Sequence, residues 1–118
     1  MSEIAENLKE RSLLFALRVM KFCRTLPDDW EGRFLSDQLF RASSRTAANY
    51  RAAGRAKSRR DFIHKLGSVV DESVFWLTLI GRSGMNETPE QKYLLGEGGE
   101  LLAIFTQSAK TASSNNRQ

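Results

Sequence analysis

The residues of this sequence best placed to do chemistry are arginines, and their spacing suits binding. On a helix, at about 100° per residue, five of them fall within about a third of the circumference: Arg33, Arg41, Arg45, Arg51 and Arg55. Guanidinium groups on one face offer planar, permanently charged donors that match phosphate and carboxylate oxygens. The spacing therefore predicts a helix face that binds a polyanion or an acidic protein, with a merely solvated face as the alternative.

The positive charge of the chain is concentrated around these arginines. Residues 33–65 hold nine Lys/Arg and two Asp, a balance of +7, whereas the other residues hold nine Lys/Arg and twelve Asp/Glu, a balance of −3. A helix that needs charge only for solubility usually interleaves signs at i and i+4, because like charges there repel. Arg41 with Arg45, and Arg51 with Arg55, are like-charged pairs at that spacing. The pattern favours binding, and the predicted nucleic-acid-binding residues are Arg33, Arg41, Arg45, Arg51, Arg55, Lys57 and Arg59.

Groups for catalysis or metal binding are missing from the sequence. It contains one histidine, one cysteine, no glycine-rich phosphate-binding motif, no HExxH and no GxSxG. Asp71 and Glu72 are adjacent, so a helix points them to different sides, and the E-x-x-H pattern of di-iron bundles is absent. His64 falls on the outer side of its helix, whereas Cys23 lies near a core face. We expect no catalytic residue, no metal site and no cofactor.

Length and composition indicate one soluble, cytoplasmic domain. A chain of 118 residues is long enough for a single core, and no apolar run approaches the ~20 residues that span a bilayer. The first residues are acidic and polar, which predicts no secretory leader. A lone cysteine excludes an intramolecular disulfide and fits a reducing compartment. The pI of 9.6 is compatible with a nucleic-acid partner.

Local start and stop signals divide the chain into four predicted helices, over residues 4–25, 33–57, 59–82 and 89–112. Pro27 ends the first helix, and an aspartate at position 28 or 29 is available to cap the second. Ser58 with Asp61 forms a capping box for the third helix. Thr88 followed by Pro89 starts the fourth. Short connections make neighbours antiparallel, so we predict an all-α, up-down-up-down antiparallel four-helix bundle of residues 1–112, followed by a disordered polar tail, residues 113–118.

Apolar spacing gives the predicted helices their core faces. In the first helix, intervals of four and three define the face Leu8, Ser12, Phe15, Val19, Phe22 and Leu26. The second helix has a stripe of mostly small residues opposite its arginines: Leu35, Leu39, Ala42, Thr46, Tyr50 and Ala53. The third helix has the face Phe62, Leu66, Val69, Val70, Ser73, Leu77 and Ile80, with Trp76 at the edge of the core. Gly96, Gly98 and Gly99 weaken the fourth helix, and we expect either a kink there or the close approach of a neighbouring backbone.

A second apolar stripe on the first helix predicts a homo-oligomer. Leu13, Leu17 and Met20 lie about 120° to 180° away from Leu8. A helix of an isolated bundle buries one stripe, so the second stripe is either partly exposed or covered by another subunit. We predict that Leu13, Leu17 and Met20 form an oligomer interface.

Several segments resemble a known protein family. They are residues 41–44 (RASS), 48–52 (ANYRA), 55–56 (RA), 61–66 (DFIHKL), 75–77 (FWL) and 101–105 (LLAIF). Over residues 8–112 the chain resembles the four-helix-bundle proteins encoded in intervening sequences of bacterial 23S rRNA genes. That family is similar to the accessory variability determinant of diversity-generating retroelements, which partners a reverse transcriptase and binds nucleic acid.

The resemblance implies a bundle that assembles into a homopentamer with a basic surface. It implies that Arg41, Arg45, Arg51 and Arg55 belong to that surface, and that Tyr50 with its neighbour Asn49 has a structural or recognition role. We expect a non-catalytic protein that binds nucleic acid, with structured RNA favoured over DNA, by neutralising phosphates. The alternative is a protein-interaction scaffold whose basic face docks an acidic partner such as a reverse transcriptase.

Overall fold

Four helices account for the fold. The computed structural model describes the backbone of residues 3–52 and 59–116, and within it the side chains of residues 7–52 and 64–107. The helices are α1 (Glu3–Cys23), α2 (Trp30–Ala52), α3 (Arg59–Arg82) and α4 (Pro89–Asn116). The described backbone contains no strand. The predicted all-α four-helix bundle is confirmed.

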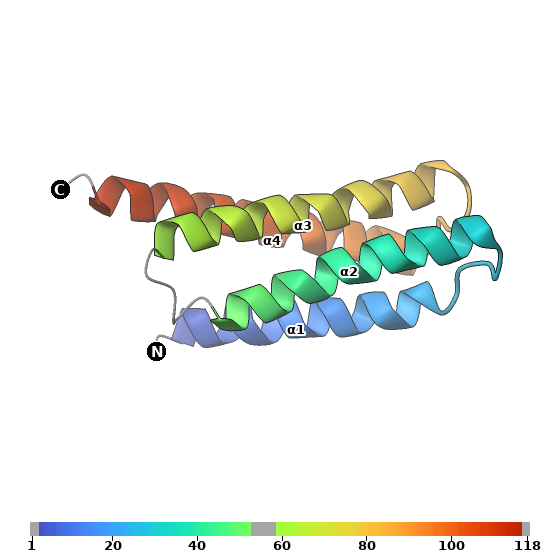
Figure 1. Cartoon of the computed structure of the whole chain (residues 1–118), viewed down its shortest axis with the longest axis horizontal. Coiled ribbons are helices and arrows are strands. Elements are labelled where there is room, and N and C mark those ends of the chain that lie inside the picture. The colour runs from blue at the N-terminus through green and yellow to red at the C-terminus, as the bar shows by residue number, and fades with distance from the viewer. Residues whose placement is uncertain (1–2, 53–58, 117–118) are drawn as a thin grey trace.

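The helices form an elongated bundle of 51 × 22 × 21 Å (Figure 1). The α1–α2 and α3–α4 connections lie at one end, here called the connector end, while α1 starts and α4 ends at the other. Consecutive helices therefore run in opposite directions. Each helix packs on its neighbours in the chain, and α4 returns beside α1 to make the loosest of the four pairings. The seam between α1 and α4 thus lies on the opposite face from the seam between α2 and α3.

The core is built from the predicted faces. Leucine, isoleucine, valine and phenylalanine from all four helices make one buried cluster: Phe15, Val19, Phe22, Leu26, Leu35, Leu39, Leu66, Val70, Leu77, Ile80, Leu94, Leu101 and Phe105. Ala42, Ser43 and Thr46 give α2 a buried stripe of small side chains, which allows close helix packing. Trp76 packs against this cluster while staying partly exposed, as predicted for the edge of the core, and Leu8, which was predicted on the core face, is also only partly buried. Phe62 and Ala53 lie outside the described side chains.

The second helix begins earlier than the sequence predicted. The carboxylate of Asp29 accepts a hydrogen bond from the backbone N–H of Gly32 at 2.8 Å, so Asp29 is the N-cap and α2 starts at Trp30, three residues before Arg33. A side chain at position 32 would collide with the carbonyl oxygen of Pro27. The prediction that an aspartate caps this helix is confirmed, whereas its predicted start at Arg33 is wrong, because glycine is tolerated in the first turn.

The connection between α3 and α4 has a glycine at its start and the predicted Thr88 cap at its end. Gly84 has φ +80° and closes the end of α3, and the Thr88 hydroxyl accepts a hydrogen bond from the Gln91 N–H at 3.3 Å. The Gln91 side chain, however, turns inward and donates to the carbonyl oxygen of Leu77 at 2.9 Å. It ties the start of α4 to α3, an interaction the local sequence does not indicate.

The remaining helix ends lie close to the predictions. α1 stops at Cys23, two residues before the predicted end, and α3 spans residues 59–82 as predicted. The helix α4 runs to Asn116, which corrects the predicted disordered tail over residues 113–116. No Pro or Gly follows Ala112, so nothing in the local sequence ends the helix there. The capping pair Ser58 and Asp61 lies outside the residues described in full.

One glycine of α4 marks a close approach between helices. A Cβ at Gly98 would lie 3.1 Å from Cγ2 of Val74 in α3 and 3.5 Å from Cζ of Phe15 in α1. At Gly96 and Gly99, a Cβ would meet nothing within 4 Å. The helix is continuous through all three glycines, and the groups that lie close to Gly98 are the side chains of Val74 and Phe15, not the neighbouring backbone that the sequence offered as one alternative.

Alanine substitutions should affect stability differently at the open site, Gly96, and at the closely packed site, Gly98. We expect Gly96→Ala to raise the free energy of unfolding by about 1 kcal/mol, because alanine is the better helix former and the site is open. Gly98→Ala should give no gain or a loss, because Val74 must shift to admit the new methyl group. Urea denaturation followed by circular dichroism measures both, and equal gains at the two sites would contradict the close packing.

Candidate nucleic-acid interface

Four described arginines lie exposed along α2 and form what we call the arginine face: Arg33, Arg41, Arg45 and Arg51. Their direction is fixed by the opposite side of the helix, where Leu35, Leu39 and Ala42 are buried. The predicted exposure of these four residues is confirmed. Arg55 and Lys57 lie outside the described residues, and Arg59 begins α3 with a side chain outside the described part.

Acidic neighbours neutralise one half of the arginine face. Arg33 pairs with Asp28 at 2.9 Å, and Arg41 pairs with Asp37 at 3.3 Å, one turn away on the same helix. Arg45 makes no ion pair with any described residue, and neither does Arg51. The uncompensated charge is thus at the C-terminal half of α2, which leads into the basic residues 55–60.

No group of His, Cys, Asp and Glu residues that could hold a metal occurs among the described residues. His64 is exposed, as predicted. Cys23 is half-buried and donates a weak hydrogen bond to the Ser36 carbonyl oxygen at 3.6 Å; burial raises its pKa to about 11, so the thiol stays protonated at neutral pH. Tyr50 packs on Phe105 with ring centroids 5.5 Å apart, which gives it a structural role. Within the described chain, no helix combines the length and hydropathy needed to cross a membrane.

The predicted oligomer stripe on α1 is only partly exposed. Leu13, Leu17 and their neighbour Leu14 are 42–53% exposed, whereas Met20 is half-buried and its sulfur accepts a hydrogen bond from Arg24 at 3.7 Å. Leu17 and Leu14 line a groove between α1 and α4, but Leu13 and Met20 do not. The sequence prediction missed Leu14, which falls between the two faces on a helical wheel.

This α1/α4 groove has a volume of about 780 Å³ and an apolar lining. Phe15, Phe22 and Leu94 of the core lie at its base, and Tyr93 is exposed on the α4 side. Three basic and two acidic residues line it: Arg11, Arg18, Lys21, Glu90 and Glu97. The groove follows from the loose pairing of α1 with α4.

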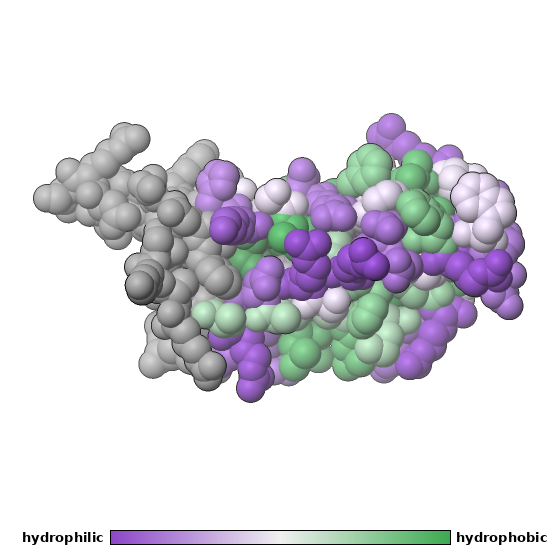
Figure 2. All heavy atoms as spheres, viewed as in Figure 1, coloured by the Kyte–Doolittle hydropathy of each residue, from purple (hydrophilic) through white to green (hydrophobic). Residues whose placement is uncertain are grey.

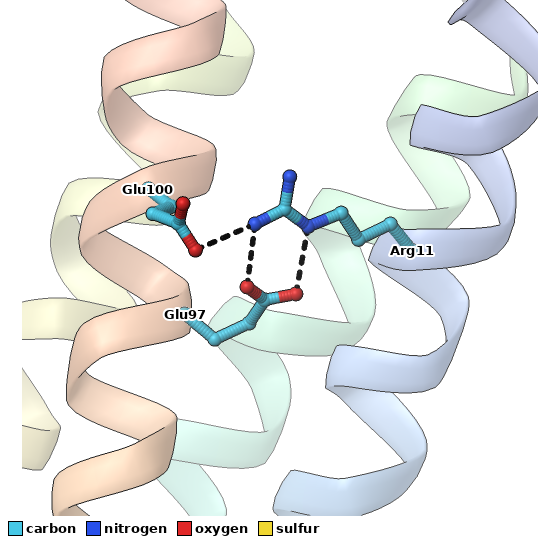
Figure 3. Close-up of polar contacts among 3 residues, drawn as sticks. All are labelled: Arg11, Glu97 and Glu100. Carbon is cyan, nitrogen blue, oxygen red and sulfur yellow. Dashed lines mark hydrogen bonds and ion pairs between the residues drawn. The ribbon is translucent and has the colours of Figure 1, made fainter.

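Ion pairs between α1 and α4 span the groove. Arg11 of α1 donates two hydrogen bonds to the Glu97 carboxylate, at 2.7 and 2.9 Å, and a third to Glu100 at 2.8 Å (Figure 3). Arg18 pairs with Glu90 at 2.6 Å, and its guanidinium lies 3.7 Å from the ring centroid of Tyr93. The hydrogen bonds from Arg11 hold the pKa of Glu97 below its ordinary value.

A second exposed apolar surface, which we call the aromatic ridge, lies on α2 and α3 at the connector end. Its members are Trp30, 72% exposed, Phe34, 49%, Phe75, 57%, and Leu79, 41%. Half-buried Trp76 fills the seam beneath them, with edge-on contacts to Phe34 and Phe75 at centroid distances of 6.0 and 4.9 Å. Green apolar patches and a purple hydrophilic band alternate on the face shown in Figure 2. A helical wheel places Trp30 and Phe34 on the side of Arg41, so the sequence already carries a signal for aromatic side chains beside the arginines.

Removing the carboxylate of Glu97 should loosen the α1/α4 seam. We expect Glu97→Gln to lower the free energy of unfolding by about 1–2 kcal/mol at pH 7, because a bidentate, partly buried pair is lost. The pKa of Glu97 is depressed in the folded state, so its stabilisation is present above its ordinary value of 4.5 and lost as the pH falls through the lower folded value. The difference between the variant and the parent should therefore shrink below about pH 4.5. Glu100→Gln, at a more exposed carboxylate with one contact, is the control and should cost less.

A solved structure is similar to this chain in fold and in sequence. No protein-family model matches the chain, and no curated protein matches it. Among solved structures, a protein of unknown function from the S23 ribosomal protein family of Bacteroides thetaiotaomicron is similar, with a TM-score of 0.77 and 26% sequence identity, over 87% of this chain and 98% of that one. The resemblance drawn from the sequence motifs is thereby confirmed: in fold and in sequence the chain is similar to a protein of the S23 ribosomal protein family, the 23S rRNA intervening-sequence type.

Proposed function

We propose that this protein is a non-catalytic, cytoplasmic nucleic-acid-binding protein that works as a homo-oligomer and favours structured RNA over DNA. The observation that carries the proposal is the uncompensated charge of Arg45 and Arg51, which are both exposed on the C-terminal half of α2. A helix packed by Leu39, Ala42 and Thr46 holds these guanidinium groups on one side, in the way a phosphate-binding surface requires.

Phosphate neutralisation is the proposed mechanism. Arg45 and Arg51 are about 9 Å apart along the helix axis, at 1.5 Å per residue. Contacts of this kind release counterions and give affinity with a steep salt dependence but little base specificity. Repetition of the same face in an oligomer would add avidity.

Charge reversal of Arg45 and Arg51 should weaken binding and flatten its salt dependence. We expect Arg45→Glu/Arg51→Glu to reduce the slope of log K against log salt by roughly one unit per lost phosphate contact. Equilibrium binding of a structured RNA and a matched DNA duplex, across a salt series, measures the slope. Arg82→Glu/Lys92→Glu changes the net charge equally at exposed sites outside the arginine face and should keep the parent slope.

Absence of RNA binding at low salt would contradict the proposal and favour the second candidate, a scaffold that docks an acidic protein such as a reverse transcriptase. An equal loss in both double variants would mean that net charge matters and the arginine face does not. The homo-oligomer is tested separately: a monomeric mass by light scattering at micromolar concentration would refute it.

A further inference from the structure

Two apolar surfaces of the bundle are uncovered, and they lie on opposite faces. The α1/α4 groove opens on one face, while the aromatic ridge stands on the α2/α3 seam of the other. Exposed apolar surfaces of this kind mark interaction sites more often than chance. The protein therefore presents two such sites, and their positions restrict what can cover both.

The two surfaces differ in shape and lie at similar positions along the long axis of the bundle. The groove is concave, whereas Trp30 and Phe75 are more than half exposed and project from their helices. Both surfaces lie toward the connector end: the groove includes Thr25 and Pro89, and the ridge includes the first residue of α2 and Leu79 near the end of α3. Two copies side by side in the same orientation would bring ridge and groove to the same height.

The charges around the two surfaces are opposite. Around the ridge, counting residues within three positions of a ridge member together with Arg41, the ion-pair partner of Asp37, the chain carries five acids and three bases, a balance of −2: Asp28, Asp29, Glu31, Asp37 and Glu72 against Arg33, Arg41 and Arg82. The charged residues that line the groove sum to +1. Arg11 and Arg18 are paired with glutamates, and Lys21 makes no ion pair with a described residue.

We infer that the aromatic ridge of one copy docks into the α1/α4 groove of a second copy. The contact is heterologous, because two different surfaces meet, and each copy keeps one free ridge and one free groove until the assembly closes. This inference deepens the proposed homo-oligomer by naming both halves of its interface, and it is independent of nucleic-acid binding.

Contacts between like surfaces fit less well. Ridge against ridge would set two convex, acidic surfaces together, and groove against groove would leave Trp30 and Phe75 of both copies in water. An acidic aromatic surface is also a poor platform for RNA, because phosphates would be repelled by Glu31 and its neighbours.

The contact leaves the proposed RNA surface accessible. Arg45 lies about 22 Å and Arg51 about 31 Å from Trp30 along the helix axis, at 1.5 Å per residue. The ridge and the uncompensated arginines therefore occupy separate halves of α2. The ridge contact itself would then include neither Arg45 nor Arg51.

Mixing two interface variants tests the inference. Leu14→Glu/Leu17→Glu removes the groove and keeps the ridge, whereas Trp30→Glu/Phe75→Glu removes the ridge and keeps the groove. We expect each variant alone to have the mass of one chain by size-exclusion chromatography with light scattering. An equimolar mixture should form a complex of two chains and no larger, because only one intact groove–ridge pair is left.

Three results would overturn the inference. They are a wild-type chain that is monomeric, a ridge variant that assembles like the wild type, and a mixture that stays monomeric. The second result would leave the proposed homo-oligomer standing, and if RNA affinity fell in that variant the ridge would be a base-stacking surface. Ser68→Glu, two turns before Phe75 at an exposed position of α3, is the matched control and should assemble normally. If circular dichroism shows that a glutamate variant is unfolded, Leu14→Gln/Leu17→Gln and Trp30→Ser/Phe75→Ser replace it.

Discussion

The pairing of α1 with α4 depends on arginine–glutamate bridges, and much of the molecular surface follows from that arrangement. Arg11 holds Glu97 with two hydrogen bonds, and Arg18 pairs with Glu90 about two helical turns away. Such bridges span a wider gap than interlocked apolar side chains, so the seam keeps an open, apolar groove. The leucines of α1 beside the groove remain exposed for the same reason.

The other helix pairs pack closely, through small residues and through a hydrogen bond from a longer side chain. Gly98 lets α4 approach Val74 of α3, and Gln91 adds a hydrogen bond to the Leu77 carbonyl oxygen. On α2, alanine, serine and threonine residues are buried between the larger core residues. Tight packing on these sides gives α2 the fixed orientation that keeps its arginines exposed.

The bundle is polarised along its long axis. Its connector end carries the aromatic ridge and the groove, together with acidic residues around Trp30. The opposite end carries Arg45 and Arg51 near the end of α2, and α3 begins there at Arg59. This separation would allow one half of each chain to hold an assembly together while the other half meets a polyanion.

The sequence by itself determined the four helices, their core faces and the exposure of the arginines on α2. These features depend on one helix at a time: the apolar period sets the buried face, and residues such as Asp29 and Thr88 set the starts. The predicted end of α4 at residue 112 was wrong, because no residue there stops the helix.

Only the tertiary structure decided which residues meet across the seams. Arg11 and Glu97 are 86 positions apart, and nothing local shows that they pair while Arg45 does not. The groove and the ridge likewise arise where two helices meet, so the stripe predicted on α1 divides, with Leu17 in the groove and Met20 half-buried. The physical reason is that each helix fixes its own faces, whereas the rotation and register of helices against one another are set by the packing of the whole core.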